Sequence, residues 1–427
     1  MNQAKEWTVK IIMACSFIVI TLICAEFVVR AMKIGCFFPP PIPPVINRGI
    51  WQTEPNMGYD FIENIPRRMF VYEEVKFPIW TNEFGCFDDP YKDEKEFILV
   101  AGDSFAMGWV PFEHTWTLRV ENEIGKRVLK CAVPGSAINE KYFKAEKVIQ
   151  KVGKNPKLII VDYFMGNMDM DYNFPMVTVI DGYLVDQTFI SDRNTGERTT
   201  RGKDELRERL NNFLTYGSSI APATLTERVK LWLSRHSALY HLIWINVPIH
   251  HILYSIGLAD SKFPDVQHYI SHSMYFENPG KYPWINKAWE MHFDSLRRIK
   301  QLAARYGSEL LFFIVPPKEQ IYKFLNPAFD NEGYDRSRKK LTAFFENEGI
   351  NYLDLEPDFI KYSNQKPRKE LNTEKDIYCR CDAHNSVKGN YLTGLLLSEF
   401  ILKKGLIDVE DRNERLLKIE AKLREFK

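Results

Sequence analysis

The sequence predicts an α/β fold in which a doubly wound, five-stranded parallel sheet carries helices on both faces. The first observation behind this prediction is a set of short apolar runs that alternate with segments of helical period. The five runs cover residues 97–101, 127–133, 157–164, 309–315 and 350–355. Most are continuously apolar, which is typical of strands buried on both faces, and strands that alternate with helices form parallel sheets.

The second observation is a long apolar segment near the N-terminus, from Trp7 to Val29. Its uninterrupted part runs from Ile11 to Ala25, and with its flanks it forms a helix of roughly 33 Å, about one hydrocarbon thickness. No small-x-small cleavage site follows, so the sequence favours an uncleaved transmembrane helix within residues 1–35 over a cleaved signal peptide. Glu26 and Arg30 are one turn apart and are expected to pair at the membrane interface.

Composition excludes one class of function. The 427 residues suit one large domain with appendages. The 57 basic and 56 acidic residues give a net charge of +1 without a basic stripe, so no nucleic-acid partner is expected. Lysines and arginines flank both ends of the apolar segment about equally, which leaves the orientation open. We expect an extracytoplasmic catalytic domain because short N-terminal anchors usually export the domain that comes after them.

The remaining chain divides into regions of different composition. Residues 36–50 contain a proline run that favours polyproline II and predicts a stiff linker. The main domain is expected to span residues 51–407. Within it, residues 172–290 form an insert, because far more chain separates the third and fourth strands than one crossover helix needs. Residues 408–427 predict a charged helix that has a solvated face or contacts a protein partner.

The insert is expected to be largely helical. Its first part, Ser191–Arg209, is polar and charged, whereas His236–Leu258 is apolar and aromatic. Interruptions in this second stretch argue against a second transmembrane helix and leave two possibilities, a kinked helix packed on the core or a cap that faces membrane or substrate. The interrupting residues are His241, Asn246, Pro248, His250 and His251.

The cysteines indicate neither a complete disulfide framework nor a metal centre. Five of the seven lie outside the apolar segment, which is an odd number. Cys379 and Cys381 are too close to bridge each other comfortably, and no second pair gives them zinc spacing. We expect free or partly paired thiols and no structural metal.

Four short segments that carry chemistry lie at or near the carboxyl ends of predicted strands. They are Gly102-Asp103-Ser104, Pro134-Gly135-Ser136, Gly166-Asn167 and Asp382-Ala383-His384. In an open α/β sheet, ligands bind outside the carboxyl ends of the strands, where the strand order reverses. The four segments are therefore expected to meet at one site.

The residue types in these segments suit acyl transfer, which needs a hydroxyl nucleophile, a base, a group that orients the base, and donors for an oxyanion. Ser104 is the candidate nucleophile, His384 the base and Asp382 the orienting acid. The backbone N–H groups of Ser104 and Gly135 and the side-chain amide of Asn167 are the candidate oxyanion donors. Each segment alone has an ordinary structural explanation, such as a turn or a helix cap, and only their common placement favours catalysis.

On these residues the chain resembles the SGNH, or GDSL, hydrolase superfamily, in which serine, glycine, asparagine and histidine blocks form the site. The four match Ser104, Gly135, Asn167 and His384, with Asp382 as the acid of the triad. The resemblance implies a flavodoxin-like sheet, serine ester hydrolysis and no cofactor. It extends to Asn82–Asp88 and to Pro55, Gly58 and Tyr59, which are similar to the lead-in of membrane-anchored members, so it covers most of residues 51–400 apart from the insert.

Two departures from the family pattern stand out. Many members have Asp-x-x-His, whereas this chain has Asp382-x-His384, a spacing similar to that of relatives that act on cell-surface polysaccharides. The arginine often found before the aspartate of the lead-in is Phe87 here. The first departure changes the expected substrate rather than the mechanism.

Three functions remain open from the sequence. The leading one is a membrane-anchored serine esterase that removes a small acyl group, such as acetyl, from an extracytoplasmic glycan or similar substrate without a metal or organic cofactor. The second is an acyltransferase or a lipid-directed esterase, to which the apolar segments would bring the acyl donor. The third is a non-catalytic scaffold that binds a protein partner through the insert or the C-terminal helix.

Overall fold

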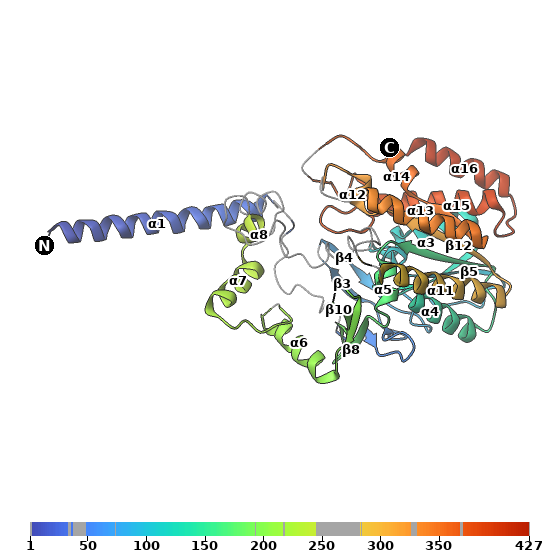
Figure 1. Ribbon diagram of the computed structural model, residues 1–427. Helices are drawn as coiled ribbons and strands as arrows, with labels where there is room; N and C mark the ends of the chain where they lie inside the picture. The colour runs from blue at the N-terminus through green and yellow to red at the C-terminus, as the bar shows by residue number, and fades with distance from the viewer. Residues whose placement is uncertain are drawn as a thin grey trace. The chain divides into compact units, whose positions relative to one another are not determined.

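A computed structural model describes residues 2–32, 36, 48–72, 74–192, 194–216, 218–244, 282, 284–325, 331–367 and 370–426. The chain divides into two compact units (Figure 1). A helical unit comprises Met1–Pro43 and Arg207–His268, and a sheet unit comprises Pro44–Leu206 and Tyr269–Lys427. The predicted proline-rich linker lies almost entirely outside the described residues.

The helical unit begins with α1 (Asn2–Ala31), which contains the predicted apolar segment. Its part from Glu6 to Ala31 is long and apolar enough to cross a membrane, a property that signal sequences share. The predicted contact between Glu26 and Arg30 is present, with 2.6 Å between the Arg30 Nε and a carboxylate oxygen. Two further helices of this unit, α7 (Leu225–His236) and α8 (Ala238–Trp244), are joined at Ser237.

The sheet unit is built on five parallel strands, as the sequence predicts. They are β5 (Phe97–Gly102), β6 (Arg127–Ala132), β7 (Leu158–Phe164), β12 (Glu309–Val315) and β13 (Asn351–Asp354). Their order across the sheet is β6-β5-β7-β12-β13, and every neighbouring pair is parallel. This is the flavodoxin-like order 2-1-3-4-5, whose switch point lies between β5 and β7.

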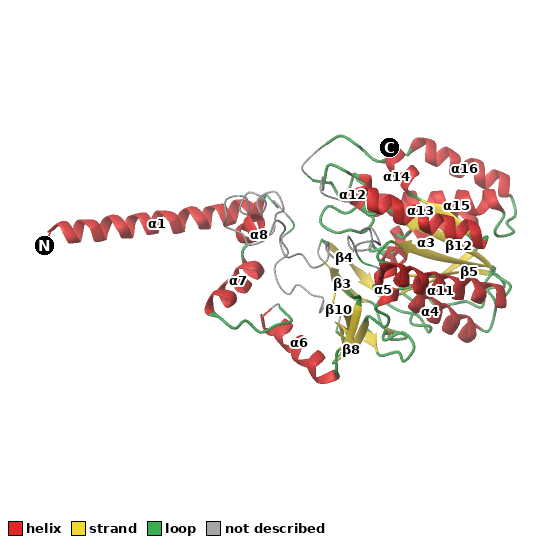
Figure 2. Cartoon of the chain, in the orientation of Figure 1, coloured by secondary structure: helices red, strands yellow, loops and turns green. Residues whose placement is uncertain are grey.

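Helices cover both faces of this sheet, and a hydrophobic core lies on each side (Figure 2). On β5, Ile98 and Val100 contribute to the core on one side, while Leu99 and Ala101 contribute to the other. This two-sided burial explains why the strands are continuously apolar in sequence. The first core includes α3 (Trp116–Ile124), α14 (Glu356–Tyr362), α15 (Val387–Lys404) and α16 (Arg412–Glu425). The second includes α4 (Ile138–Val152), α5 (Asn167–Tyr172), α11 (Trp284–Arg305) and α13 (Asn331–Glu348).

The lead-in before the sheet forms two small antiparallel pairs. These are β1 (Trp51–Gln52) with β2 (Asp60–Phe61), and β3 (Arg68–Tyr72) with β4 (Val75–Ile79). The turn after them is held by Asn82, whose side-chain oxygen accepts from the backbone N–H groups of Phe84 and Cys86.

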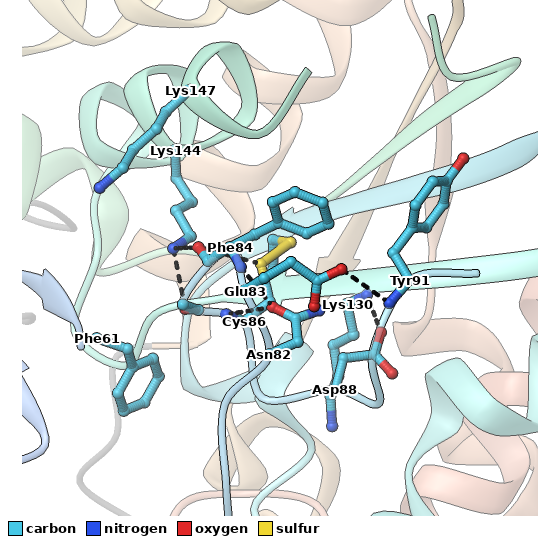
Figure 3. The surroundings of a disulfide bond; sticks show 12 residues. Phe61, Asn82, Glu83, Phe84, Cys86, Asp88, Tyr91, Lys130, Lys144 and Lys147 are labelled. Atoms are coloured by element: carbon cyan, nitrogen blue, oxygen red, sulfur yellow. Dashed lines mark hydrogen bonds between the residues drawn. A yellow bond between two sulfur atoms is a disulfide. The ribbon is translucent and has the colours of Figure 1, made fainter. Parts of the chain in front are cut away.

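A disulfide joins this turn to the central sheet (Figure 3). Cys86 bonds to Cys131 of β6, with 4.5 Å between their Cα atoms. The sequence prediction of free or partly paired thiols did not identify this pair, because disulfide connectivity cannot be deduced from cysteine counts. Lys144 of α4 also donates to the carbonyl groups of Phe84 and Gly85, so the turn is fastened to two elements of the sheet unit.

The insert differs in part from the largely helical structure that the sequence predicts. It begins with two β-hairpins, β8 (Val177–Ile180) with β9 (Tyr183–Asp186), and β10 (Thr188–Asp192) with β11 (Glu197–Thr200). Helices then follow: α6 (Lys203–Tyr216), α7 and α8. Of the predicted apolar stretch His236–Leu258, residues 245–258 lie outside the described residues.

The C-terminal helix α16 packs on the sheet unit. Ile419 and Leu423 are buried against the core, and Lys422 forms an ion pair with Glu123 of α3 at 2.7 Å. Its apolar face is therefore covered within the chain. The other residues of α16 include the exposed Leu417.

Candidate active site

Three of the predicted site residues form a hydrogen-bonded chain at the carboxyl edge of the sheet. The His384 Nε2 lies 2.6 Å from the Ser104 Oγ, and the His384 Nδ1 contacts the Asp382 Oδ1. Because a carboxylate only accepts, Nδ1 carries the proton and Nε2 accepts from the serine hydroxyl. Asp382 is buried, whereas Ser104 and His384 are partly exposed. The three side chains are therefore linked in the order that a nucleophile, a base and an orienting acid would need, and the serine end is partly exposed.

The turn that presents Ser104 is shaped by the residues around it. A Cβ at Gly102 would lie 2.4 Å from the Asp162 carboxylate, so only glycine fits this position without a shift. The Asp103 side chain accepts from the Phe105 N–H at 2.9 Å and caps the short helix α2 (Ser104–Met107). The chain therefore turns sharply from strand to helix, and Ser104 stands at the first position of the helix.

A buried ionic cluster lies directly behind the nucleophile. The Lys141 Nζ is 2.9 Å from carboxylate oxygens of both Asp103 and Asp162, and all three side chains are buried. Burial opposes the charge on Asp103, but Lys141 outweighs it and lowers the pKa of Asp103 to about 2. Burial and the neighbouring Asp103 charge raise the pKa of Asp162 well above its usual value. Like charges this close repel each other, and the positive charge of Lys141 between the two carboxylates offsets that repulsion.

Two aromatic rings contact the imidazole of His384. Trp109 stacks on His384 with 4.7 Å between ring centroids, and Phe105 lies 4.8 Å away in a tilted contact. Trp109 has a positive φ of 54°, a conformation that is uncommon for a bulky residue and is found mostly where surrounding structure imposes it. Phe70 of β3 packs edge-on against Trp109 at 5.2 Å. Two rings that follow Ser104 therefore contact His384 directly, and Phe70 of β3 supports one of them.

The loop that carries Asp382 and His384 is tied to the nucleophile turn by a buried asparagine. Asn390 of α15 donates to the carbonyl of Gly108, just after α2, and to the carbonyl of Asn385, just after the histidine. The same loop closes on itself through an antiparallel bridge between Tyr378 and Asn385. Two segments far apart in sequence are therefore held at a fixed spacing through one amide side chain.

Two side chains of opposite charge form hydrogen bonds with the backbone of this loop. The Glu74 carboxylate, in the β3–β4 turn, accepts from the N–H groups of Cys381 at 2.6 Å and Asp382 at 3.2 Å. Lys318, in α12 (Lys318–Ile321) after β12, donates to the carbonyl of Asp382 at 3.0 Å. Asp382 is therefore held through both its backbone N–H and its backbone carbonyl.

The charge on Asp382 is also stabilised electrostatically. Burial tends to raise its pKa, but the His384 ring, the His384 backbone N–H and the positive charge of Lys318 together hold the pKa of Asp382 below its usual value. An ionised carboxylate at this position can hold the imidazole in one orientation and would favour a positive charge on the ring.

The predicted oxyanion residues Gly135 and Asn167 lie near the turn that presents Ser104, and their surroundings differ. Gly135 adopts a positive φ of 77°, which glycine tolerates. Asn167 is 1% exposed, and its amide donates to the Asp103 Oδ2 at 3.1 Å and to the Ser136 carbonyl at 3.3 Å. Asn167 thus contacts the residue next to Ser104, but its N–H groups point into protein. Its role as an oxyanion donor stays a prediction.

Sequence reasoning missed several residues around the site. Glu74, Lys318 and Lys141 act on backbone groups or on other buried charges, which no local motif reveals. One feature of the sequence could have indicated Trp109, because it follows a glycine that lies one turn after Ser104. Among the described residues, no group of three or more histidine, cysteine or acidic side chains could hold a metal.

Comparisons with known proteins find structural similarity without sequence similarity. No family model matches the chain, and no curated protein matches it. An acetyl xylan esterase structure has 9% identity and a TM-score of 0.33, and the match covers 70% of this chain and 97% of that one. A structure from Desulfitobacterium hafniense, assigned to the lipolytic G-D-S-L family, has 10% identity, a TM-score of 0.30 and coverage of 72% and 99%. A structure from Bacteroides fragilis, assigned as an acylhydrolase, has 11% identity, a TM-score of 0.32 and coverage of 75% and 92%.

Proposed function

We propose that this chain is a serine ester hydrolase of the SGNH type. One observation carries the proposal: the Ser104 Oγ, the His384 ring and the Asp382 carboxylate form a continuous hydrogen-bonded chain at the switch point of the sheet. The three residues come from segments 280 positions apart, and the proton of each donor has an acceptor in the next residue. This is the arrangement that acyl transfer through a serine requires.

The proposed reaction has two steps, acylation of Ser104 and hydrolysis of the acyl-enzyme. The Ser104 Oγ attacks the ester carbonyl while His384 Nε2 takes the hydroxyl proton, and Asp382 stabilises the resulting imidazolium. The tetrahedral intermediate collapses, the alcohol leaves with the proton from His384, and the acyl group remains on Ser104. Water then attacks the acyl-enzyme with His384 again as base, and the acid is released as Ser104 regains its proton.

The oxyanion formed in each half needs preorganised donors. The Ser104 N–H lies at the start of α2, and the Gly135 N–H belongs to the loop after β6. Asn167 becomes the third donor if its amide exchanges the Ser136 carbonyl for the oxyanion. Donors fixed in a water-poor pocket stabilise the developing charge without reorganisation, and each contributes about 10²–10³ in turnover.

The proposed substrate is a small acyl ester, such as an acetyl group, on an extracytoplasmic glycan or similar polyol. The short Asp382-x-His384 spacing supports this class. The Cys86–Cys131 disulfide supports an oxidising compartment for the sheet unit, because such bonds persist mainly outside the cytosol. The length and apolar composition of α1 support a single membrane span that anchors the enzyme.

Hydrolysis of p-nitrophenyl acetate by the full chain tests the activity. We expect Ser104→Ala to remove turnover, while Ser308→Ala leaves it unchanged. Ser308 is a matched control because it precedes β12 at the opposite edge of the sheet and donates to a backbone carbonyl. Equal turnover by the wild type and Ser104→Ala would refute the proposal. A preference for long acyl chains in an ester series would instead favour the lipid-directed alternative.

A further inference from the structure

The helix α7 exposes an apolar stripe in a chain that already has one apolar helix. Leu225, Val229 and Trp232 are spaced by four and three residues and therefore share one face of the helix. They are 77%, 48% and 58% exposed. His236 continues the same face and stacks on Trp232 at 4.9 Å. No residue of α7 is buried, so packing within the part of the chain that the structure describes does not account for this stripe.

Basic residues accompany the stripe. The helix contains Arg228, Lys230 and Arg235 against a single acidic residue, Glu227. At 100° per residue, both arginines project to one flank of the apolar face, where a long side chain can reach polar headgroups while its stem stays on the apolar side. Glu227 is occupied at the start of the helix, where it accepts from the N–H groups of Ala223 and Thr224.

The end of α7 is fixed to the end of the apolar helix. The Arg30 side chain donates to the carbonyl of His236, the last residue of α7. Glu26 accepts from the Ser237 hydroxyl at 2.8 Å and from the N–H groups of Ala238 and Leu239 at 2.8 and 2.9 Å. Accordingly, α8 packs against the C-terminal end of α1, and α7 packs against α8 (Figure 1).

These contacts determine the depth of α7 relative to α1. Glu26 is the first charged residue after the uninterrupted apolar run, and Arg30 lies one turn further on. In a spanning helix, this pair marks the boundary between hydrocarbon and headgroups. His236, the last residue of α7, accepts from Arg30, and the next residue, Ser237, donates to Glu26, so the C-terminus of α7 lies within about one helical turn, 5.4 Å, of that boundary.

We propose that α7 is an interfacial helix that lies on a lipid bilayer containing anionic lipids, with Leu225, Val229 and Trp232 inserted among the acyl chains. The inference rests on the proposed membrane span of α1. Amphipathic helices of this composition insert their apolar face about 5–10 Å, and tryptophan is enriched at this depth. Arg228 and Arg235 then meet lipid phosphates, which makes the contact stronger on an anionic surface.

The contact needs little intrinsic affinity, because α1 already holds α7 at the bilayer. Tethering converts insertion into an intramolecular step, so no translational freedom of the whole protein is lost. The hydrophobic stabilisation grows with the apolar area removed from water, and Leu225, Val229 and Trp232 supply that area. If α1 spans a bilayer, that same bilayer is the apolar surface next to the exposed stripe of α7.

The test uses the full chain in vesicles of phosphatidylcholine brominated near the headgroup, with and without phosphatidylglycerol. Bromine quenches nearby tryptophan, so the contribution of Trp232 is the difference between the wild type and Trp232→Phe. The chain has nine tryptophans, so we expect that difference to approach one ninth of the total tryptophan fluorescence. We expect it to increase with phosphatidylglycerol. Val229→Glu should abolish it, whereas Leu417→Glu should not. Leu417 is a suitable control because it is 63% exposed on α16 of the sheet unit.

Resistance to extraction by alkaline carbonate reports separately on α1. Equal quenching of the wild type and Trp232→Phe in carbonate-resistant protein overturns the interfacial helix and leaves the anchor intact. Release of the wild type by carbonate overturns the anchor and the interfacial helix together. Retention of Val229→Glu in the membrane, with its Trp232 quenching lost, is the result that the proposal expects.

Discussion

Two aspartate–histidine pairs in the sheet unit have similar geometry and opposite surroundings. At the candidate site, the His384 Nδ1 contacts Asp382. Between α5 and α11, the His292 Nδ1 lies 2.6 Å from Asp171. The His384 side chain is 15% exposed, whereas His292 is 0% exposed. The same chemical pair is therefore present once with access to solvent and once without it.

The hydroxyl on the far side of each ring completes the difference. The partly exposed Ser104 hydroxyl lies 2.6 Å from one Nε2, and the buried Tyr163 hydroxyl lies 2.9 Å from the other. Burial and the charge of Asp171 raise the pKa of Tyr163 well above its usual value, so this hydroxyl remains protonated. A hydroxyl–histidine–aspartate chain thus indicates catalysis only where the hydroxyl can reach a substrate. The buried chain fastens α5 and α11 to the sheet.

Replacing the two histidines should separate these roles most sharply. His384→Gln removes the base, so we expect kcat for p-nitrophenyl acetate to fall by about 10⁴-fold or more with little change in thermal midpoint. His292→Gln leaves buried polar partners unsatisfied, so we expect a loss of about 2–4 kcal/mol in the free energy of unfolding. Folded His292→Gln should retain turnover within a few-fold. Equal loss of kcat in both variants would contradict the assignment.

An asparagine lies next to each of the two hydrogen-bonded chains and extends the same comparison. Asn167 donates to Asp103 beside the nucleophile, and Asn139 donates to Asp171 at 3.2 Å. Because Asn167 is the proposed third oxyanion donor, Asn167→Ala should lower kcat by about 10²–10³ with a small change in KM. Asn139→Ala should lower only the thermal midpoint. Unchanged kcat in Asn167→Ala would leave Asn167 as a brace for Asp103.

The loop that carries Asp382 and His384 is held through its backbone by Glu74 and Lys318. Glu74→Gln keeps the shape of the side chain but weakens its bonds to the N–H groups of Cys381 and Asp382. We expect a fall in kcat of about tenfold, because a small misplacement of the acid and base is costly. Partial recovery in Glu74→Asp would show a positioning role. Glu83→Gln is the matched control, since Glu83 also accepts from a backbone N–H, that of Tyr91, away from the site; a similar loss there would contradict the prediction.

The smallest expected effect is on acid stability. The pKa of Asp382 is lower in the folded chain than its usual value of 3.8, so its ionised form contributes stability at higher pH. That contribution is fully present above about pH 4 and is lost as the pH falls through the folded pKa. The difference in unfolding free energy between the wild type and Asp382→Asn should therefore be constant from pH 5 to 7 and decrease below pH 4. A difference in unfolding free energy that increases as the pH falls would contradict this prediction.

Much of the fold could be predicted from the sequence, because burial on both faces leaves a continuous apolar run in each strand. The run Phe97–Ala101 is apolar at every position, and the structure confirms it and the four other strands. The hairpins around Val177–Thr200 were missed because their strands are short and are partly buried or, in β11, exposed at every position, so neither face imposes a regular alternation.

The proximity of the candidate site residues could be predicted from the sequence only where a short motif lies at the end of a strand. Ser104 and His384 are such residues, since each lies at a turn next to the carboxyl edge of the sheet. Glu74, Lys318 and the His292 chain depend on which segments meet after folding, and isolated glutamates, lysines and histidines are otherwise common surface or core residues. The exposed stripe of α7 is visible as a pattern in sequence, but its exposure is not.

The most direct test of the esterase assignment is covalent labelling of the folded full chain with a fluorophosphonate, followed by peptide mass spectrometry. A serine activated by a neighbouring histidine attacks this reagent, whereas an ordinary turn serine does not. We predict a single stoichiometric adduct on the peptide that contains Ser104, absent in Ser104→Ala and strongly reduced in His384→Gln. Folded wild-type protein that remains unlabelled at Ser104 would contradict the esterase assignment.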